Sequence, residues 1–570
     1  MPTPLMRLIT AVLILAAGPA SGLAEDRVEQ RVRVFAEDRD SLQAKYRVDM
    51  AEETAERMKA DFRQKLDELR SLDFDSLSRD EQVDAVLLRA EIEHALRLQE
   101  RDAKADARAA DLIAPVRPLV ETLHAALITE QVKAKDVARM FSDVAESLQK
   151  KTAAFRDDDR KAEPLDNAAK ADALWAARRI DDLRRDLTEF HQFRDGYDPL
   201  YTWWCSKPQE GLDAALADYT RAIRETLVGV KEGDDDTIIG VPIGTEALLG
   251  DLRHEFIAYP PQRLMEIAER ELAWCDREMK AAAAEMGLGD DWRAALDRTK
   301  EDYVDPGEQP ALIRTLAEEA TALIEEKGLI TLPPLCKESW RMEMMTPQRQ
   351  RVNPFFTGGP VISISYPTAD MTFPEKLMGM RGNNPHFCRA TVHHELIPGH
   401  HLQLFMMPRH RPYRQVFRTP FWIEGWALYW EMRLWDMGFA RNAKEKMGML
   451  FWRKHRAARI LFSLRYQTGE WTPEQCVEFL IETVGFERKN ATAEVRRSVM
   501  GGYSPLYQAA YMLGGLQMRD LHRDVVEGGR MSEREFHDFV LRQNAIPLDL
   551  IRMQLLEEPL TLDHESDWEF

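Results

Sequence analysis

The chain contains 570 residues with a mass of 65.7 kDa, and its 44% hydrophobic residues are enough to bury a large core. Its 29 Gly, 29 Pro and 5 Cys exclude collagen, low-complexity disorder and small disulfide scaffolds. A net charge of −20, from 97 acidic against 77 basic residues, argues against nucleic acid as a partner, because such a surface repels phosphate.

Residues 1–24 have the pattern of a secretory signal peptide. Arg7 precedes a run, Leu8–Ala17, that is apolar except for Thr10, and small residues follow up to Ala24. A run of about 10 residues is too short for a membrane anchor, which needs about 20. No Cys follows the run to accept a lipid. We therefore expect cleavage after Ala24 and an exported chain without stable membrane insertion.

Residues 25–330 are expected to form an N-terminal helical lobe, because apolar residues recur there at helical spacing. Ser78 and Glu81 have the spacing of a capping box that begins a helix. The stretch 196–250 is richer in Gly, Pro and aromatic residues, for which we expect irregular structure. Two further segments with a helical pattern are residues 261–287 and 310–327.

Residues 331–570 are expected to form a second, catalytic lobe. Its one convincing strand, residues 361–366, alternates apolar and polar side chains between segments that contain proline. Flanking prolines are typical of an edge strand, which could add a substrate backbone to the sheet or pack as a hairpin. Helical patterns return after Arg389, and Thr472-Pro473-Glu474-Gln475 combines an N-cap, a first-turn proline and a capping-box partner.

A cluster of histidines in this lobe indicates metal chemistry. Four of the 14 histidines fall between residues 393 and 401. His394 followed directly by Glu395 is the core of the His-Glu-x-x-His zinc site, in which two imidazoles bind the metal and the glutamate acts on its water. Here Pro398 stands at the fourth position after His394, and the next histidine is His400.

This spacing requires a deformed helix. On a straight helix, positions six apart point about 240° away from each other, so His394 and His400 could not share one ion. Pro398 has no N–H to continue the helix, and Gly399 accepts backbone angles that other residues avoid. We therefore expect a two-residue bulge that brings His394 and His400 onto one face.

A third ligand is expected on the aromatic-rich segment 420–431, since catalytic zinc usually has three protein ligands. Glu424 and Glu431 are seven residues apart and share a helical face. An acid on so apolar a segment is costly to bury unless it is paired or bound to metal. We assign Glu424 as the metal ligand and Glu431 as a residue that contacts one of the ligands without binding the metal itself. The alternative is that these acids pair with Arg433 or other cations.

Three motifs carry a resemblance to a known family: His394-Glu395-x-x-Pro398-Gly399-His400-His401-x-Gln403, Glu424-Gly425-Trp426-Ala427-x-Tyr429-x-Glu431, and the segment Pro505–Gly514. The sequence resembles the bacterial domain of unknown function 885 family, which is grouped with zinc metallopeptidases of the gluzincin type. In the third motif it keeps the family's Pro, Tyr and Gly but departs from its pattern at positions 506–508. The resemblance implies a mainly helical, two-lobed body around a deep cleft, with a small β-sheet beside the metal site.

The expected function is an exported zinc metallopeptidase, located in the bacterial periplasm, that hydrolyses a peptide or small amide through a metal-activated water. Glu395 is the expected general base, and Tyr511 is the first choice to stabilise the carbonyl oxygen. The other candidates that contact substrate or support the site are His393, His401, Tyr503, Tyr507 and Arg497. For His393 and His401 a structural role is the alternative, and for Arg497 a solvated surface position.

Two other functions stay open at this point. A metal-dependent esterase or cell-wall amidase could use the same site. A non-catalytic exported binding protein could retain a metal or histidine core, although a scaffold has no need of a general base such as Glu395 beside its ligands.

Overall fold

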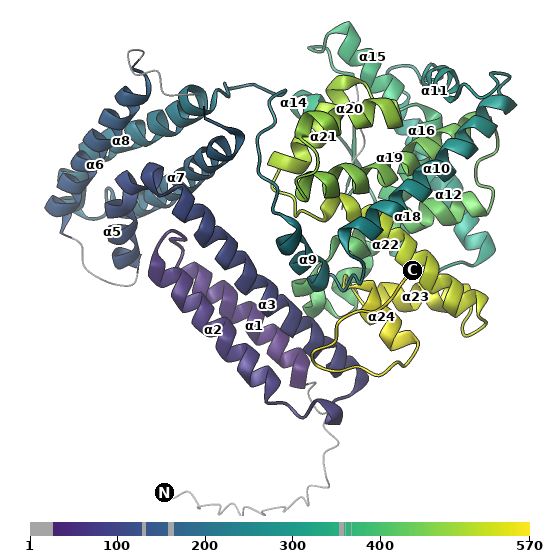
Figure 1. The fold of residues 1–570 in the computed structure, drawn as a ribbon, viewed down its shortest axis with the longest axis horizontal. Helices are drawn as coiled ribbons and strands as arrows, with labels where there is room; N and C mark the ends of the chain where they lie inside the picture. The colour runs from purple at the N-terminus through teal and green to yellow at the C-terminus, as the bar shows by residue number, and fades with distance from the viewer. Residues whose placement is uncertain (1–26, 128–132, 158–164, 353–357, 360, 366) are drawn as a thin grey trace, which may run out of the picture.

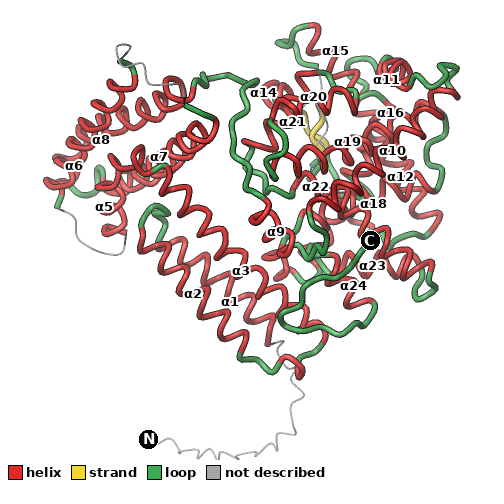
Figure 2. The backbone as a smooth tube through the Cα atoms, in the orientation of Figure 1, coloured by secondary structure: helices red, strands yellow, loops and turns green. Residues whose placement is uncertain are grey.

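The regular secondary structure of the computed structural model is almost entirely helical, as Figure 1 and Figure 2 show. It describes residues 27–127, 133–157, 165–352, 358–359, 361–365 and 367–570. The mainly helical fold predicted from the sequence is confirmed. The predicted signal peptide lies outside the described residues. Among the residues described, no helix is both long enough and apolar enough to cross a membrane.

Three long antiparallel helices open the chain and lie side by side in Figure 1. They are α1 (Arg27–Lys45), α2 (Glu52–Arg70) and α3 (Arg79–Arg108). The predicted capping box begins α3: the Ser78 hydroxyl accepts from the backbone N–H of Glu81, and the Glu81 carboxylate accepts from the backbone N–H of Ser78.

The next helices surround a second apolar core. They are α4 (Ala110–Ile113), α5 (Arg117–Leu127), α6 (Ala134–Phe155), α7 (Asn167–Arg194) and α8 (Pro199–Ala222). The irregular structure expected from residue 196 is wrong for α8. Asp198 accepts hydrogen bonds from the N–H groups of Leu200 and Tyr201, and Pro199 takes the first helical position, so this proline starts a helix instead of interrupting one.

The remaining helices form the larger body on the right of Figure 1. They are α9 (Thr245–His254), α10 (Pro261–Glu285), α11 (Trp292–Lys300), α12 (Gln309–Lys327), α13 (Pro334–Ser339), α14 (Pro347–Val352), α15 (Phe373–Gly382), α16 (Pro385–Glu395), α17 (His400–Met406), α18 (Pro420–Asp436), α19 (Ala443–Gln467), α20 (Pro473–Val484), α21 (Arg488–Met500), α22 (Tyr507–His522), α23 (Glu533–Arg542) and α24 (Leu548–Leu555). The helices predicted at 261–287 and 310–327 are therefore present as α10 and α12. The predicted start signals at Thr472 open α20.

The chain has one small parallel sheet among its described residues. Strand β1 (Met342–Met344) pairs with β2 (Ile362–Ile364) in parallel register. The predicted strand is therefore present but shorter, and its parallel pairing excludes the hairpin alternative. Both isoleucines of β2 are buried, and they share a small core with Val392 and Leu396 of the segment that carries the histidines. The sheet thus supports α16 from one side.

The largest core joins α1–α3 to α9–α12 and to the C-terminal helices. The domain boundary expected at residue 330 stays a prediction. Within this core α18 and α22 cross at two glycines: a Cβ on Gly425 would lie 2.6 Å from the Cα of Gly514. Only glycines permit so close an approach of two helix backbones. This close crossing places Glu424, the residue before Gly425, next to the tyrosines of α22.

Candidate metal centre

The helix carrying the histidines breaks between His394 and His400, as the spacing predicts. The N–H of Gly399 bonds to the carbonyl of His393, six residues back instead of four. The change is larger than a bulge, because α16 ends at Glu395 and α17 begins at His400. A Cβ on Gly399 would lie 1.8 Å from the carbonyl oxygen of His394, so only glycine fits this turn.

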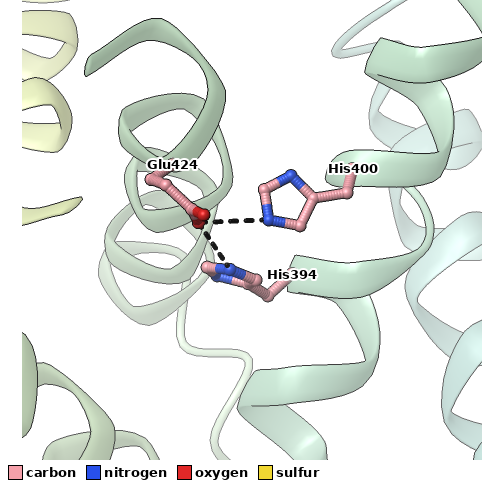
Figure 3. Close-up of side chains that lie close together, drawn as sticks. All are labelled: His394, His400 and Glu424. Atoms are coloured by element: carbon pink, nitrogen blue, oxygen red, sulfur yellow. Dashed lines mark ion pairs between the residues drawn. The ribbon is translucent and has the colours of Figure 1, made fainter. Parts of the chain in front are cut away.

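The break brings two imidazoles and one carboxylate to a common point (Figure 3). Glu424 Oε2 lies 3.6 Å from His394 Nε2 and 3.2 Å from His400 Nε2. All three side chains are buried or nearly so, and their ligand atoms lie within 4.8 Å of one another. Glu424 Oε2 is buried and accepts no hydrogen bond. A buried carboxylate oxygen without a donor, facing two ring nitrogens, matches the donor set of a cation site.

The other nitrogen of each imidazole is held by an acceptor. Glu431 Oε1 lies 2.6 Å from His394 Nδ1, and Gln403 Oε1 lies 3.0 Å from His400 Nδ1. The amide of Gln403 donates to the carbonyl of Trp422, so its oxygen must face the histidine. Both acceptors favour a proton on Nδ1, so that Nε2 of each ring is the nitrogen that would bind a metal, as in metal sites with supported histidines.

The electrostatics of the centre favour positive charge. Burial alone would lower the pKa of His394, but Glu424 and Glu431 outweigh it and raise the pKa to about 9. Burial likewise opposes ionisation of Glu424, yet His400 and His394 hold its pKa well below the usual range. Two buried carboxylates around two imidazoles therefore form a site that a cation would neutralise.

The linker between the two histidine helices is fixed by α18. The indole N–H of Trp426 donates to the carbonyl of Pro398 over 2.7 Å. Trp422, Trp426 and Trp430 are all fully buried, so the helix that carries Glu424 is anchored on its opposite side as well. Arg433 pairs with Glu533 over 2.7 Å, so the ion pair weighed as an alternative role for Glu424 and Glu431 is not formed with that arginine.

Glu395 lines the same cavity as the three candidate ligands, which has a volume of about 520 Å³. Burial raises its pKa above the usual value of a glutamate, although His394 and His400 oppose the shift. Gly358 packs against it, because a Cβ there would lie 2.0 Å from Glu395 Oε2. The carboxylate is therefore confined beside the centre without being one of its three converging groups.

Three tyrosines of the predicted set line the cavity. Tyr507 donates a 2.6 Å hydrogen bond to Glu424 Oε1, and Tyr511 Oη lies 3.4 Å from Tyr507 Oη. The ring of Tyr511 stacks on that of His394 at 6.3 Å. Burial raises the pKa of Tyr511 to about 12, with Glu424 adding to the shift, so its hydroxyl stays a donor at neutral pH. Tyr503 packs against Tyr507 with its ring tilted by 34°, and it is 38% exposed, which places it at the mouth of the cavity.

The remaining predicted residues fall into two groups. His393 and His401 do not line the cavity: His393 packs edge-on against Phe439, and His401 Nε2 lies 2.9 Å from the carbonyl of Cys336. Both positions fit the structural alternative. Arg497 does line the cavity, but its guanidinium donates to Glu494 over 2.6 Å.

The sequence reasoning missed three residues of the site. Gln403 stands in the quoted motif without an assigned role, and it proves to hold His400. Arg456 and Arg459 of α19 line the cavity although each is at most 6% exposed. Their signal is a pair of arginines three residues apart in a helical stretch that is otherwise buried.

A second histidine–glutamate group, His522, Glu533 and His537, also converges within 4.8 Å. Two of its three side chains are already engaged, however, although His522 Nε2 is buried without a hydrogen-bond partner. The two ring nitrogens of His537 contact Tyr429 Oη and the carbonyl of Leu329, each at 2.8 Å. Glu533 also holds the Arg433 guanidinium, so this group has more internal partners than the one around His394.

The chain belongs to the family described as "Bacterial protein of unknown function (DUF885)", which it matches over residues 38–555. Its structure is similar to that of a "putative lipoprotein of unknown function" from Shewanella oneidensis, with a TM-score of 0.67 and 15% identity over 93% of this chain and 99% of that one. It is also similar to a "putative lipoprotein" from Colwellia psychrerythraea, with a TM-score of 0.57 and 16% identity over 93% of this chain and 97% of that one. At such identities the likeness shows the fold alone. No curated protein matches the sequence.

Proposed function

We propose that the protein is a zinc-dependent metallopeptidase of the gluzincin type. The observation that carries this proposal is the convergence of His394, His400 and Glu424 in a cavity that Glu395 also lines. The break between α16 and α17 provides what the straight helix of the His-Glu-x-x-His site provides elsewhere, two imidazoles and an adjacent carboxylate.

The spacing of the three groups fits zinc. Two ligand atoms at about 2.1 Å from a tetrahedral ion lie about 3.4 Å apart. The distances of Glu424 Oε2 from the two histidine nitrogens, 3.2 and 3.6 Å, bracket this value. Three protein ligands would leave a fourth position facing the cavity, which is the arrangement of catalytic and not structural zinc.

The residues of the chain divide the chemistry among them. A bound zinc ion would supply Lewis acidity that polarises the scissile carbonyl and acidifies water. Glu395 would take the proton of the attacking water and pass it to the leaving amine. Tyr511, whose hydroxyl stays protonated, would donate to the developing oxyanion, while Tyr507 orients Glu424. In this account the cavity of about 520 Å³ is the floor of the substrate cleft of a two-lobed metallopeptidase.

We also infer that the protein acts outside the cytoplasm. The leader predicted at residues 1–24 is one support for this inference. The description of each of the two similar structures as a "putative lipoprotein" is another, since lipoproteins are exported.

Two variants test the proposal with different readouts. Glu395→Gln keeps the ligands but removes the base, so the protein should retain zinc and lose peptide hydrolysis by several orders of magnitude. Glu424→Ala should lose zinc affinity and activity together. Full activity of Glu395→Gln would contradict the assigned base. Hydrolysis of esters or muropeptides without peptide hydrolysis would favour an esterase or amidase on the same site.

A further inference from the structure

Arg456 is a buried cation without a matching acceptor. It is 6% exposed and lines the cavity of the candidate centre. Its Nε is buried and donates to no acceptor, and its ion-pair partner, Glu431 Oε1, lies 3.8 Å away, beyond hydrogen-bond distance. Glu431 already accepts from His394. A guanidinium removed from water in this way normally has a bidentate acceptor.

Two other buried arginines each have a carboxylate within hydrogen-bond distance. Arg389, 2% exposed, donates to both oxygens of Glu319 over 2.8 and 2.9 Å. Arg453 lies on the same helix as Arg456 with the same 6% exposure, and its Nε and Nη2 donate to one oxygen of Glu271 over 3.2 and 2.8 Å, while its Nη1 is buried without a partner. The difference is that Arg456 faces the cavity, where the missing acceptor would be a ligand.

Arg459 extends the cationic surface. Its guanidinium lies 4.5 Å from the ring centroid of Tyr511, and that of Arg456 lies 4.8 Å from the same centroid. The Nε of Arg459 donates to Glu494 over 2.6 Å, but its Nη1 is buried and has no acceptor. The ring of Tyr511 stacks on His394, so both arginines lie close to the candidate metal ligands.

The charge lining the whole cavity is also positive. Its described lining contains five arginines and three glutamates in a protein whose net charge is −20. A positive cavity in an acidic protein attracts small anions and orients them, and a metal ion would add to this field. The volume of about 520 Å³ is that of a small-ligand site, and apolar side chains such as Leu404 and Ile423 complete the wall.

We propose that Arg456 and Arg459 form a carboxylate subsite, and that the substrates are short peptides whose free C-terminal carboxylate binds there. This assignment rests on the proposed peptidase function for the reaction, but carboxylate binding itself does not require turnover. A C-terminus held beside the metal ligands would limit cleavage to bonds near the end of a chain. Arg456 is then a specificity-determining residue that contacts substrate.

The test measures binding by calorimetry to the zinc-loaded Glu395→Gln protein, which does not consume its ligand. The probes are Ala-Ala-Phe, Ala-Ala-Phe amide and Ala-Ala-Glu amide. The free acid should bind about tenfold or more tightly than its amide, because a charge-assisted pair is lost in the amide. Ala-Ala-Glu amide, whose carboxylate is on the side chain, should bind as weakly as Ala-Ala-Phe amide.

Variants then assign the effect to Arg456. In the same background Arg456→Met should weaken binding of the free acid by about 10- to 100-fold and leave the amide within about twofold. Arg456→Lys, which keeps the charge but not the planar fork, should give an intermediate loss and serves if the methionine variant does not fold. Arg453→Lys, on the same helix but away from the cavity, should leave both affinities unchanged.

The outcomes separate the two proposals. Equal weakening of acid and amide by Arg456→Met would mean that Arg456 only offsets Glu431, and would overturn the subsite. Tight binding of Ala-Ala-Glu amide would overturn the C-terminal assignment. If wild-type protein hydrolyses no peptide but the preference for the free acid depends on Arg456, the peptidase proposal fails and the carboxylate subsite stands.

Discussion

Replacing Glu431 by glutamine tests whether the carboxylate that contacts His394 Nδ1 increases the zinc affinity of the site. The 2.6 Å contact with His394 Nδ1 is charge-assisted, and glutamine can keep its geometry while losing its charge. A charge-assisted hydrogen bond contributes about 1.5–3 kcal/mol and a neutral one about 1 kcal/mol. The difference of about 1.4 kcal/mol corresponds to roughly tenfold weaker zinc binding. Glu431→Ala, which also removes the hydrogen bond, should weaken it by about 100-fold.

The assay is a competition titration in which the protein and a chromophoric chelator share a limiting amount of zinc. The control is Glu533→Gln, the same change in the second histidine–glutamate group, where Glu533 is paired with Arg433. It should leave zinc affinity unchanged. Unaltered affinity in both Glu431 variants, with all proteins folded by circular dichroism, would refute the role assigned to this carboxylate.

Two further changes probe the construction of the site, and a third probes the pH dependence of stability. Gly425→Ala should cost about 1–3 kcal/mol in chemical denaturation, because its Cβ would lie 2.6 Å from the Cα of Gly514, and an unchanged midpoint would contradict the close crossing. Gly358→Ala should displace the base and reduce hydrolysis with zinc content intact; loss of zinc instead would show that the loop supports the ligands. His94 and His254 stack on each other, and burial is the main cause that lowers the pKa of His94 to about 4 and that of His254 to about 3. Because the unfolded chain takes up these protons below about pH 6.5 and the folded chain does not, the free energy of unfolding decreases as pH falls from 6.5 toward 4. The drop in Tm between pH 7 and pH 5 should therefore shrink in His94→Phe, and an equal drop would exclude this pair as its source.

Much of the site could be predicted because its chemistry conflicts with its local sequence. An acid such as Glu424 in a segment of tryptophans needs a partner, and a six-residue histidine spacing around Pro398 and Gly399 needs a broken helix. Both conflicts are resolved by the same centre in the structure. The start signals at Ser78 and Thr472 act locally, within one helical turn, so they too could be read without tertiary information.

What escaped prediction depends on contacts between distant segments. Arg456 faces the cavity and Arg453 faces α10, but both stand in the same largely buried stretch of sequence. Only the packing of α19 in the structure distinguishes them. The helix α8 was missed because exposed aromatic residues, including the 82% exposed Trp203, obscure its periodicity. The parallel pairing of β1 and β2 likewise joins residues 20 positions apart, for which the sequence has no local signal.

The most direct test of the account is the metal content of the protein, purified without a metal-affinity tag and dialysed against metal-free buffer. Plasma mass spectrometry should find about one zinc per chain in the wild type and much less in Glu424→Ala. Absence of metal from the wild type even after zinc is offered at neutral pH would contradict the metal centre, because His394, His400 and Glu424 would then converge without binding an ion.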